Sequence, residues 1–445
     1  MKILGLDIGT TTISAVVLED GRELASRTRP NGAFLPDREP WEKLQDPAAI
    51  RAAALDTVEE LFRRYPDIAR IGVTGQMHGI LYLDRSGAPV SPLYTWQDGR
   101  GDRLRDGNET YAACLSRLTG YPLATGYGLV THFYNLENGL VPEDAAVFCT
   151  IHDYLAMVLC GASRPVTDVS DAASFGVFDV KRGRFDLDAL RTAGIDPGLL
   201  PEIAEAPCIG RYRDNVRVCA AIGDNQASFL GAADGNLERM LVNIGTGSQF
   251  SVYTPAYLDC PGLETRPFPG GGYLVVGASL CGGRAFALLE EFFRRTAGML
   301  GVDTPSCYAA MDALLAKSPR PRDLPRITPL FQGTRQEPGL RGSIEGLSTE
   351  NFTPLHLIWA MMEGMTWELY QMAVLYEAAG GAPAPLIGSG NGLRKNPFLQ
   401  DCIRETFGRE LRLSSCNEEA ATGAARFAAR EEISSFDCFS QNGVV

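Results

Sequence analysis

The sequence has few of the residues that build metal centres and disulfide frameworks. It holds four histidines in 445 residues, and its eleven cysteines, an odd number, include no Cys-x-x-Cys pair. Zinc sites and disulfide-stabilised domains normally show paired, closely spaced ligands. We therefore expect reduced thiols that pack as small hydrophobic side chains, and neither structural zinc nor disulfide bridges.

Positive charge is also scarce. Lysine and arginine number 41 against 54 aspartates and glutamates, which gives a formal net charge of −13. A protein that binds nucleic acid or an anionic membrane surface normally carries an excess of positive charge. The composition predicts no nucleic-acid partner, and any phosphate must be held by backbone amides or by a metal ion.

Long apolar runs and a Walker motif are missing as well. The uncharged stretch 118–136 contains glycine, proline and threonine together with His132 and Asn135, which does not suit a membrane span. The first residues enter an apolar run that meets Asp7 without the features of a signal peptide. We expect a cytoplasmic protein with no membrane partner. The absence of Gly-x-x-x-x-Gly-Lys-Ser/Thr excludes P-loop architecture.

What is present describes a globular chain of at least two hydrophobic cores, with 45% hydrophobic and 21% charged residues. Apolar patterning predicts strands over 3–8, 13–18 and 23–28, with a hairpin turn at Asp20 and Gly21. Asp46 and Pro47 then predict the start of a helix.

The opening pattern of strand, glycine-led turn and strand returns at 240–253. This recurrence indicates an internal duplication of one α/β unit, with two domains and a cleft between them. We place the boundary near residues 234–236. The last helix is expected to be capped by Asn417 and to run to about Arg430.

Asp7 ends the first strand and is followed by a turn of glycine and threonine at 9–12. Backbone N–H groups and hydroxyls of such a turn can hold phosphate oxygens while the acid faces a hydrated Mg²⁺. A plain β-turn with a solvated aspartate is the alternative. The similar turn at 245–248 favours the phosphate site, since two such turns could hold a polyphosphate.

Asp224 stands where a predicted strand over 218–222 meets a helix of small residues. The helix macrodipole is expected to keep its pKa low, so that it is ionised at neutral pH. An ionised carboxylate can accept the proton of a substrate hydroxyl as that oxygen attacks phosphorus. An ordinary helix cap is the alternative, and the local sequence does not separate the two.

Gln76, His78, Trp96 and Asp98 lie near predicted strand ends. They supply what a polyol pocket uses: donors for hydroxyls, an aromatic wall for the C–H face and a carboxylate acceptor. His78 alone could be a satisfied core histidine, but the cluster favours a binding site. The glycine-rich loop at 388–392 could let a nucleobase approach the backbone, or could simply need positive φ.

The sequence resembles the FGGY family of carbohydrate kinases over nearly its whole length, and within it the branch of sedoheptulokinases and xylulokinases. The resemblance rests on residues 6–11 (LDIGTT), 75–79 (GQMHG), 94–100 (YTWQDGR), 223–225 (GDN), 245–247 (GTG), 342–347 (GSIEGL), 356–357 (HL) and 360–363 (AMME). One departure is Thr131, in a segment where the family has lysine.

The resemblance implies an α/β fold of two actin-like, ribonuclease-H-like domains with an interdomain active-site cleft, and ATP and Mg²⁺ as cofactors. It implies an N-terminal domain over 1–234 for the sugar and the catalytic base, a C-terminal domain over 235–432 for the nucleotide, and a tail over 433–445. Asp224 matches the catalytic base, and Asp7 the acid that binds Mg²⁺ through water. The sugar contacts would be Gln76, Met77, His78, Trp96, Asp98 and Asn225. The ATP contacts would be Thr10, Thr11, Gly245, Thr246, Gly247, Gly390 and Asn391.

We therefore expect ATP-dependent phosphorylation of a ketose at a terminal primary hydroxyl, with sedoheptulose favoured over xylulose or another polyol. An actin-like ATPase and a sugar-sensing protein without kinase activity are the alternatives from other classes. The cluster around Gln76 and Trp96 argues against the ATPase, which has no evident use for a sugar pocket. No oligomeric state is predicted.

Overall fold

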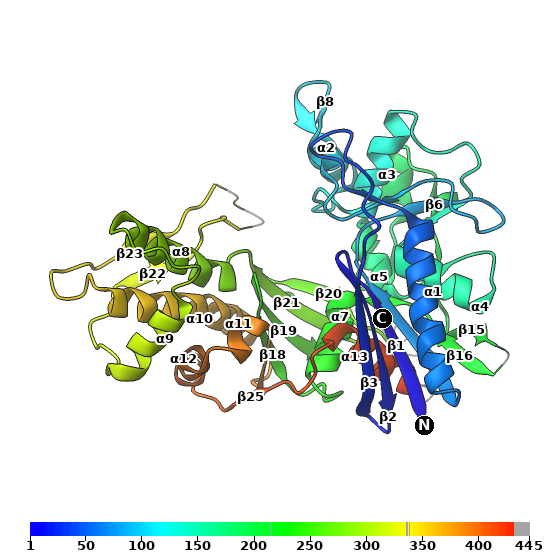
Figure 1. Ribbon diagram of the computed structural model, residues 1–445. Coiled ribbons are helices and arrows are strands. Elements are labelled where there is room, and N and C mark those ends of the chain that lie inside the picture. Colours follow the sequence, from blue (N-terminus) through cyan, green and yellow to red (C-terminus); the bar gives the residue numbers. More distant parts are fainter. Residues whose placement is uncertain (214, 335–336, 338, 431–445) are drawn as a thin grey trace. The chain divides into compact units, whose positions relative to one another are not determined.

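The structure is a computed structural model that describes residues 1–213, 215–334, 337 and 339–430 (Figure 1). The chain forms two compact units. The first comprises Met1–Gly235, Arg266–Tyr273 and the described residues from Cys416 onward, and the second comprises Asn236–Thr265 and Leu274–Ser415. The tail expected over 433–445 lies outside the described residues.

The first unit is built on a mixed sheet in the order β15-β16-β5-β1-β2-β3, with β17 paired to β5. Strands β1, β2 and β3 form the expected antiparallel meander, and β5 runs parallel to β1, β16 and β17. Asp20 and Gly21 both have positive φ, as the predicted hairpin turn requires. The strands are β1 (Lys2–Ile8), β2 (Thr12–Glu19), β3 (Arg22–Pro30), β5 (Ile68–Gly75), β15 (Cys208–Tyr212), β16 (Val216–Cys219) and β17 (Ile222–Gly223).

Helices α1 (Pro47–Arg64) and α4 (Ile151–Cys160) cover one face of this sheet, where they share a core with Leu4, Leu6 and Ile8 of β1. Asp46 caps α1 through the N–H of Ala48, as predicted. In Figure 1, α1 runs along β1 on this side. The alternation of side chains along β1 leaves Gly5 for the opposite face.

Helices α7 (Asp224–Ala232) and α13 (Glu419–Ala429) cover that opposite face and lie side by side (Figure 1). A Cβ on Gly5 would stand 1.8 Å from the carbonyl oxygen of Ala421, and a Cβ on Gly72 would stand 2.0 Å from that of Ala424. Glycine therefore lets the backbone of α13 rest directly on the sheet. By these contacts α13 belongs to the first unit, although the expected domain over 235–432 included it.

The start of α13 also differs from the sequence expectation. The helix is preceded by Glu418, which makes no side-chain capping bond, so the expected cap at Asn417 is wrong. Glu418 instead accepts a hydrogen bond of 2.7 Å from Thr28 of β3. The long-range contact with the sheet fixes this helix start.

Short elements between the main strands of the first unit enclose a second apolar core around Tyr82, Phe133, Phe148 and Phe175. They are β4 (Leu44–Gln45), β6 (Leu81–Leu83), β7 (Leu93–Tyr94), η1 (Gly99–Asp102), β8 (Leu104–Arg105), β9 (Glu109–Thr110), α2 (Tyr111–Thr119), α3 (Gly128–Glu137), β10 (Val147–Cys149), β11 (Val166–Thr167), α5 (Val169–Ala172), η2 (Ala173–Phe175), β12 (Phe178–Asp179), β13 (Arg184–Phe185), α6 (Leu187–Thr192), η3 (Pro197–Leu199) and β14 (Glu202–Ile203).

The second unit has a sheet in the order β20-β21-β19-β18-β24-β25. Its β18–β19 hairpin and the parallel partner β24 repeat the arrangement of β1, β2 and β5. The strands are β18 (Met240–Ile244), β19 (Ser248–Thr254), β20 (Glu264–Pro267), β21 (Tyr273–Ser279), β22 (Arg326–Thr328), β23 (Ser343–Glu345), β24 (Leu386–Ser389) and β25 (Leu411–Leu413).

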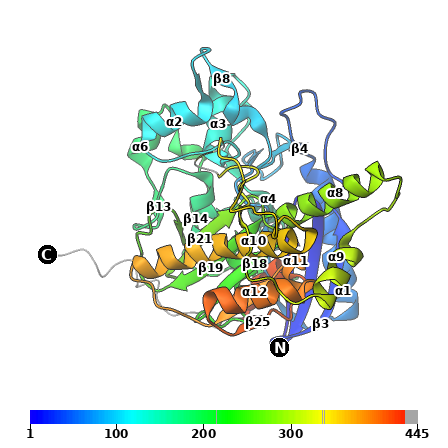
Figure 2. The same cartoon turned by 90° about the vertical axis from the view of Figure 1, so that its left-hand side faces the viewer.

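Helices α10 and α12 pack against each other and share a large core with β18 and β19 (Figure 2). The helices of this unit are α8 (Gly283–Met299), α9 (Tyr308–Lys317), α10 (Pro354–Ala378), α11 (Asn391–Arg394) and α12 (Pro397–Phe407). Asn396 caps α12 and Gly408 ends it in the left-handed conformation, as the sequence predicted. Among the helices described, none combines the length and the apolar character that crossing a membrane requires.

Candidate active site

Three parallel strands of the first unit bring its two candidate acids to one edge of the sheet. In the pairing of β1 with β5, Asp7 stands opposite Thr74, and in the pairing of β5 with β17, Gly75 stands opposite Gly223. Asp224 follows as the first residue of α7. The carboxyl ends of adjacent parallel strands share an edge, so the predicted acid and the predicted base lie near each other.

Burial is the largest cause of a raised pKa at both acids. Burial, followed by the charge of Asp224, raises the pKa of Asp7 to about 7. Burial raises the pKa of Asp224 to about 6, although His152 opposes this shift. The expectation that the helix macrodipole keeps the pKa of Asp224 low is therefore wrong, because desolvation outweighs the favourable end of α7. A base that titrates near neutrality is well matched to proton transfer at physiological pH.

Residues 76–78 continue from β5 at the same edge. The N–H of Gln76 donates to the carbonyl oxygen of Ile8 at 2.9 Å, which extends the pairing with β1. Met77 is buried and packs on Gly223, where an added Cβ would stand 2.7 Å from the Met77 methyl group. Gln76 and Met77 are thus held directly beside the two acids.

His78 has a φ of 72°, a conformation that non-glycine residues rarely adopt outside functional sites. Its N–H donates to Ser174 Oγ at 3.2 Å. Its Nδ1 lies 2.8 Å from the carbonyl oxygen of Ser174, which can only accept, so Nδ1 carries the proton. The ring stacks on Tyr127 with centroids 4.7 Å apart. In the neutral ring Nε2 is then an acceptor, which is the role a sugar hydroxyl requires.

Trp96 and Gln76 are tied to the first glycine-led turn through Thr10. Trp96 Nε1 donates to Thr10 Oγ1 at 2.9 Å, and Thr10 Oγ1 donates to Gln76 Oε1 at 3.3 Å. The buried Gln45 closes a ring, because it accepts from Gln76 Nε2 at 2.8 Å and donates to the carbonyl oxygen of Thr10 at 2.9 Å. Residues predicted for sugar and for phosphate thus share one hydrogen-bonded ring.

The turn itself is also supported from β3. Asn31 donates its side-chain amide to the carbonyl oxygen of Gly9 and its N–H to that of Thr11, both at 2.8 Å. Thr11 is exposed and Thr10 is half-buried. The turn therefore keeps a fixed backbone while Thr11 remains accessible to a ligand.

Asn225 follows Asp224 in the first turn of α7. Within the described part of the chain, its Oδ1 is buried and has no hydrogen-bond partner. An unsatisfied buried oxygen costs stability unless a ligand or water satisfies it. This atom fits the sugar contact predicted for Asn225.

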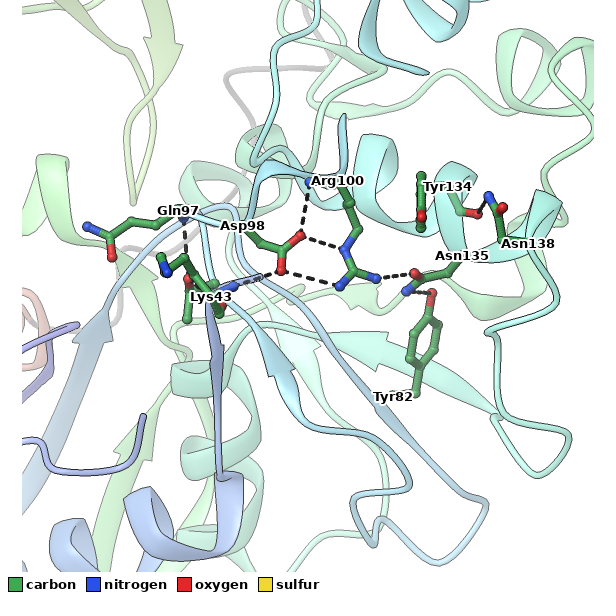
Figure 3. Close-up of polar contacts among 9 residues, drawn as sticks. Lys43, Tyr82, Gln97, Asp98, Arg100, Tyr134, Asn135 and Asn138 are labelled. Atoms are coloured by element: carbon green, nitrogen blue, oxygen red, sulfur yellow. Dashed lines mark hydrogen bonds and ion pairs between the residues drawn. The ribbon is translucent and has the colours of Figure 1, made fainter. Parts of the chain in front are cut away.

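Asp98 has a different role from the one expected. Its carboxylate accepts from Lys43 N at 3.1 Å, and from Arg100 N, Nε and Nη2 at 3.1, 2.6 and 3.3 Å. Arg100 bonds in turn to Asn135, which donates to Tyr82 at 3.3 Å (Figure 3). Because these bonds occupy both carboxylate oxygens of a fully buried side chain, Asp98 stabilises the loop after Trp96 and does not offer an acceptor to a sugar.

The second unit repeats the glycine-led turn after β18. Gly245 and Gly247 are half-buried, and Thr246 is exposed. The N–H groups of Gly283 and Arg284, at the start of α8, donate to the carbonyl oxygens of Gly245 and Thr246 at 3.0 and 2.9 Å. Gly283 permits this approach, since a Cβ there would stand 2.4 Å from the Gly245 oxygen.

The predicted adenosine residues lie beside this turn. Asn243 of β18 donates to Ser389 Oγ at 2.6 Å at the end of β24. Gly390 has a φ of 87°, and a Cβ there would stand 2.4 Å from the carbonyl oxygen of Ile244. Glycine is therefore required by the backbone itself at this position. The exposed Asn391 begins α11 at the same edge.

The sequence did not reveal the residues that hold the candidate site in place through hydrogen bonds. Gln45 and Asn31 fix the first turn. Ser170 and Ser174 bond to Gly223 and His78, and Asp171 bonds to Ser174. These partners lie far away in the sequence from the residues they hold. A buried polar run at 167–174 was the available signal, because such residues need partners.

Comparisons with known proteins identify the family. Residues 2–231 match the model of the N-terminal domain of the FGGY family of carbohydrate kinases, and residues 240–432 match that of its C-terminal domain. A sedoheptulokinase from Mus musculus is 29% identical and covers 97% of this chain and 98% of its own length. A sedoheptulokinase from Homo sapiens is 28% identical with the same coverage.

A solved structure with the same fold is the xylulose kinase from Rhodospirillum rubrum, with a TM-score of 0.83 and 24% identity over 96% of this chain and 89% of that chain. The fold expectation of two α/β domains is confirmed, whereas the cleft between them stays a prediction. The chain spans the matched domains and relatives almost completely. It therefore belongs to the FGGY family of carbohydrate kinases and is an ATP-using phosphotransferase that acts on a sugar.

Proposed function

We propose that the protein transfers the γ-phosphoryl group of ATP to the terminal primary hydroxyl of a ketose, with Asp224 as the general base. The observation that carries this proposal is the meeting of Asp7, Gln76 and Asp224 at the ends of three adjacent parallel strands. A half-buried candidate base with a pKa of about 6 stands there next to unsatisfied polar groups suited to hydroxyls.

The chemical step follows from these positions. Asp224 accepts the proton of the sugar hydroxyl as that oxygen attacks the γ-phosphorus, the bond from the γ-phosphorus to the bridging oxygen breaks, and ADP leaves with that electron pair. Gln76, Met77, His78, Trp96 and Asn225 orient the sugar. Asp98 supports the Trp96 loop from within.

Thr10, Thr11 and the turn at Gly245–Gly247 supply hydroxyl and backbone donors for the phosphates, and Gly390 with Asn391 flank the nucleoside. Asp7 fits Mg²⁺, because within the described residues its carboxylate has no hydrogen-bond or ion-pair partner while burial raises its pKa. The described residues contain no group of three or more side chains suited to hold a metal alone. A single carboxylate with waters and phosphates is how Mg²⁺ commonly binds, and it neutralises charge on the phosphates.

Sedoheptulose is the favoured acceptor because the two sedoheptulokinases are 29% and 28% identical to this chain, against 24% for the xylulose kinase from Rhodospirillum rubrum. Xylulose is the alternative, since a xylulose kinase shares the fold. Both sugars present a primary hydroxyl next to further hydroxyls, which the same polar residues could contact.

The test is a coupled assay of ADP release with ATP and Mg²⁺ over sedoheptulose, xylulose, glycerol, gluconate and no sugar, with mass spectrometry of the product. The highest kcat/KM for sedoheptulose, with one phosphate added, supports the proposal. If kcat/KM is highest for xylulose, the acceptor is xylulose and not sedoheptulose. ADP release that is indifferent to every sugar, or sugar binding without phosphosugar, overturns it in favour of an ATPase or a sensor.

A further inference from the structure

A short buried segment contacts both halves of the candidate sugar site. Helix α5 packs against β17, and η2 follows it directly. We call residues 168–174 the support segment. Its polar members Asp168, Ser170, Asp171 and Ser174 are all at most 5% exposed. Buried polar side chains are costly unless hydrogen bonds satisfy them, so their partners show what the segment holds in place.

Ser170 holds the strand that leads to the base. Its Oγ accepts the N–H of Gly223 at 3.2 Å. The same hydroxyl donates to Asp168 Oδ1 at 2.5 Å, which fixes the orientation of its lone pairs. Gly223 is the residue directly before Asp224, so this bond sets where α7 begins.

Ser174 holds the strained residue of the sugar loop. Its Oγ accepts the N–H of His78, and its carbonyl oxygen accepts from His78 Nδ1. Both bonds hold a residue whose φ of 72° is unfavourable without support. Ser174 Oγ donates onward to Asp171 Oδ1 at 3.2 Å.

Asp171 anchors the segment to α4 and its cap. Its Oδ2 accepts from Thr150 Oγ1 at 2.9 Å and lies 2.9 Å from His152 Nε2. Both side chains of the latter pair are fully buried. A buried pair of this kind is geometrically demanding, and loss of one partner leaves the other unsatisfied.

We propose that Ser170, Asp171 and Ser174 are positioning residues: Ser170 sets the place of Asp224, Ser174 sets the place of His78, and Asp171 anchors the segment that carries both serines to Thr150 and His152. This inference rests on the proposed function, in which Asp224 is the base and His78 contacts the sugar. None of the three touches substrate in this account. They act through the backbone of Gly223 and of His78.

Proton transfer and phosphoryl transfer both require the reacting groups to be placed accurately, which is why positioning residues matter here. A displacement of about 1 Å in a reacting group can lower a rate by about 100-fold. Gly223 lacks a side chain that could brace the strand end, and the conformation of His78 needs support. One rigid segment that holds both positions keeps the base and the sugar hydroxyl aligned.

The test compares Ser170→Ala, Ser174→Ala and Asp171→Asn in the full chain, using the sugar with the highest kcat/KM in the assay above. Ser91→Ala is the matched control: Ser91 Oγ also accepts a backbone N–H, that of Tyr82 at 2.9 Å, in the same unit but away from the acids. Melting temperature, kcat and the KM for sugar are measured for each variant.

The proposal expects a split between the two serines. Ser170→Ala lowers kcat about tenfold or more with a smaller change in sugar KM, because the base is displaced. Ser174→Ala raises sugar KM by about tenfold with a smaller change in kcat, as loss of one hydrogen bond at a binding residue predicts. Asp171→Asn does both. In the double variant of Asp171→Asn with Ser174→Ala, the effects on sugar KM are less than additive, because the two side chains act in one chain of bonds.

Serine variants that behave as Ser91→Ala does, or that change kcat and KM in the same proportion, overturn the inference. If Asp171→Asn fails to fold, the two serine variants decide the outcome. Asp224→Asn distinguishes failure of the proposed function from failure of this inference. Near-normal turnover of Asp224→Asn shows that Asp224 is not the base. An inactive Asp224→Asn together with unaffected serine variants refutes only the role of the support segment.

Discussion

At the scale of a single residue, the proposed role of Asp224 as the base depends on the surroundings of its carboxylate. Burial raises its pKa to about 6, and Asp7 at the end of the neighbouring strand has a pKa raised to about 7. Two half-buried acids of like charge are unfavourable for folding, so their proximity points to a use in catalysis. His152 is the group that opposes burial most strongly at Asp224.

Replacement of this acid by its amide should abolish proton transfer and spare binding. We expect Asp224→Asn to lower kcat by about 100- to 10,000-fold, because a positioned general base contributes about that factor. Calorimetric titration with sugar should still show binding, since Asn225 and residues 76–78 are unchanged.

Asp186→Asn is the matched control for that substitution. Asp186 also stands at a helix start in the first unit, where it caps α6 through the N–H of Ala189. Its variant should keep the wild-type kcat. Equal turnover of the two variants would mean that Asp224 is not the base.

The raised pKa values of Asp7 and Asp224 predict how kcat/KM depends on pH. A carboxylate must be ionised to accept a proton, and an acid whose pKa is raised keeps its own proton until the pH exceeds that value. With both substrates well below saturation, kcat/KM should rise with pH between about 6 and 7 and level off above pH 7. The two apparent pKa values of this profile belong to Asp7 and Asp224 as a pair. A profile that stays flat down to about pH 4.5 contradicts the burial of these acids.

At this scale the sequence predicted the positions of the candidate residues at strand ends better than it predicted their surroundings. Asp7, Gln76 and Asp224 follow from strand ends, which are local patterns. The saturation of Asp98 by Arg100 and Lys43, and the raised pKa of Asp224, depend on neighbours brought by the fold. No local pattern contains that information.

At the scale of elements, the close contact of α13 with the sheet is the most demanding feature of the first unit. Gly5 and Gly72 present no side chain where the backbone of α13 crosses, and Gly423 makes similar room for α7, with a Cβ there 1.7 Å from the carbonyl oxygen of Ala227. Small residues on all three elements allow the backbones to pack directly.

Addition of one methyl group at this contact should therefore lower the free energy of unfolding. We expect Gly5→Ala to destabilise the protein by about 3 kcal/mol, because an overpacked core must shift backbone and not a flexible side chain. Gly32→Ala is the control, since a Cβ there meets no atom within 4 Å. Urea denaturation of both variants measures the difference, and an equal midpoint for the two would contradict the contact.

Element boundaries were predictable where a local signal ends or begins them. The turn at Asp20 and Gly21, the cap at Asp46 and the closing Gly408 are such cases. The observed cap of α13 lies one residue after the predicted one, at Glu418, whose side chain bonds to Thr28, far away in the sequence. The strands around Tyr82 have two or three residues each, too few to show a period, so no local pattern outlines that core.

At the scale of the whole molecule, the two units repeat one topology. A hairpin and a parallel third strand stand at the centre of both sheets, as the recurrence of the glycine-led turns predicted. The chain order does not follow the units, because α13 returns to the first unit after the second is complete.

A truncated chain tests this return. A chain that ends at Ser415 lacks α13 and exposes the faces of β1, β5 and α7 that it covers. We expect this chain to lose the cooperative unfolding of the first unit and all kinase activity. A chain that ends at Arg430 keeps α13 and serves as the control, and calorimetry of both shows the loss. Wild-type unfolding of the shorter chain would contradict the assignment of α13.

The late position of α13 also governs the order of events during synthesis. The strands of the first unit leave the ribosome early, yet the helix that covers them is translated only after the whole second unit. Nascent chains therefore carry one face of this sheet without α13 until the second unit has been translated, a state in which chaperones commonly engage. The acids at its edge acquire their final surroundings only when the helix docks, so an unfinished polypeptide has no competent catalytic centre.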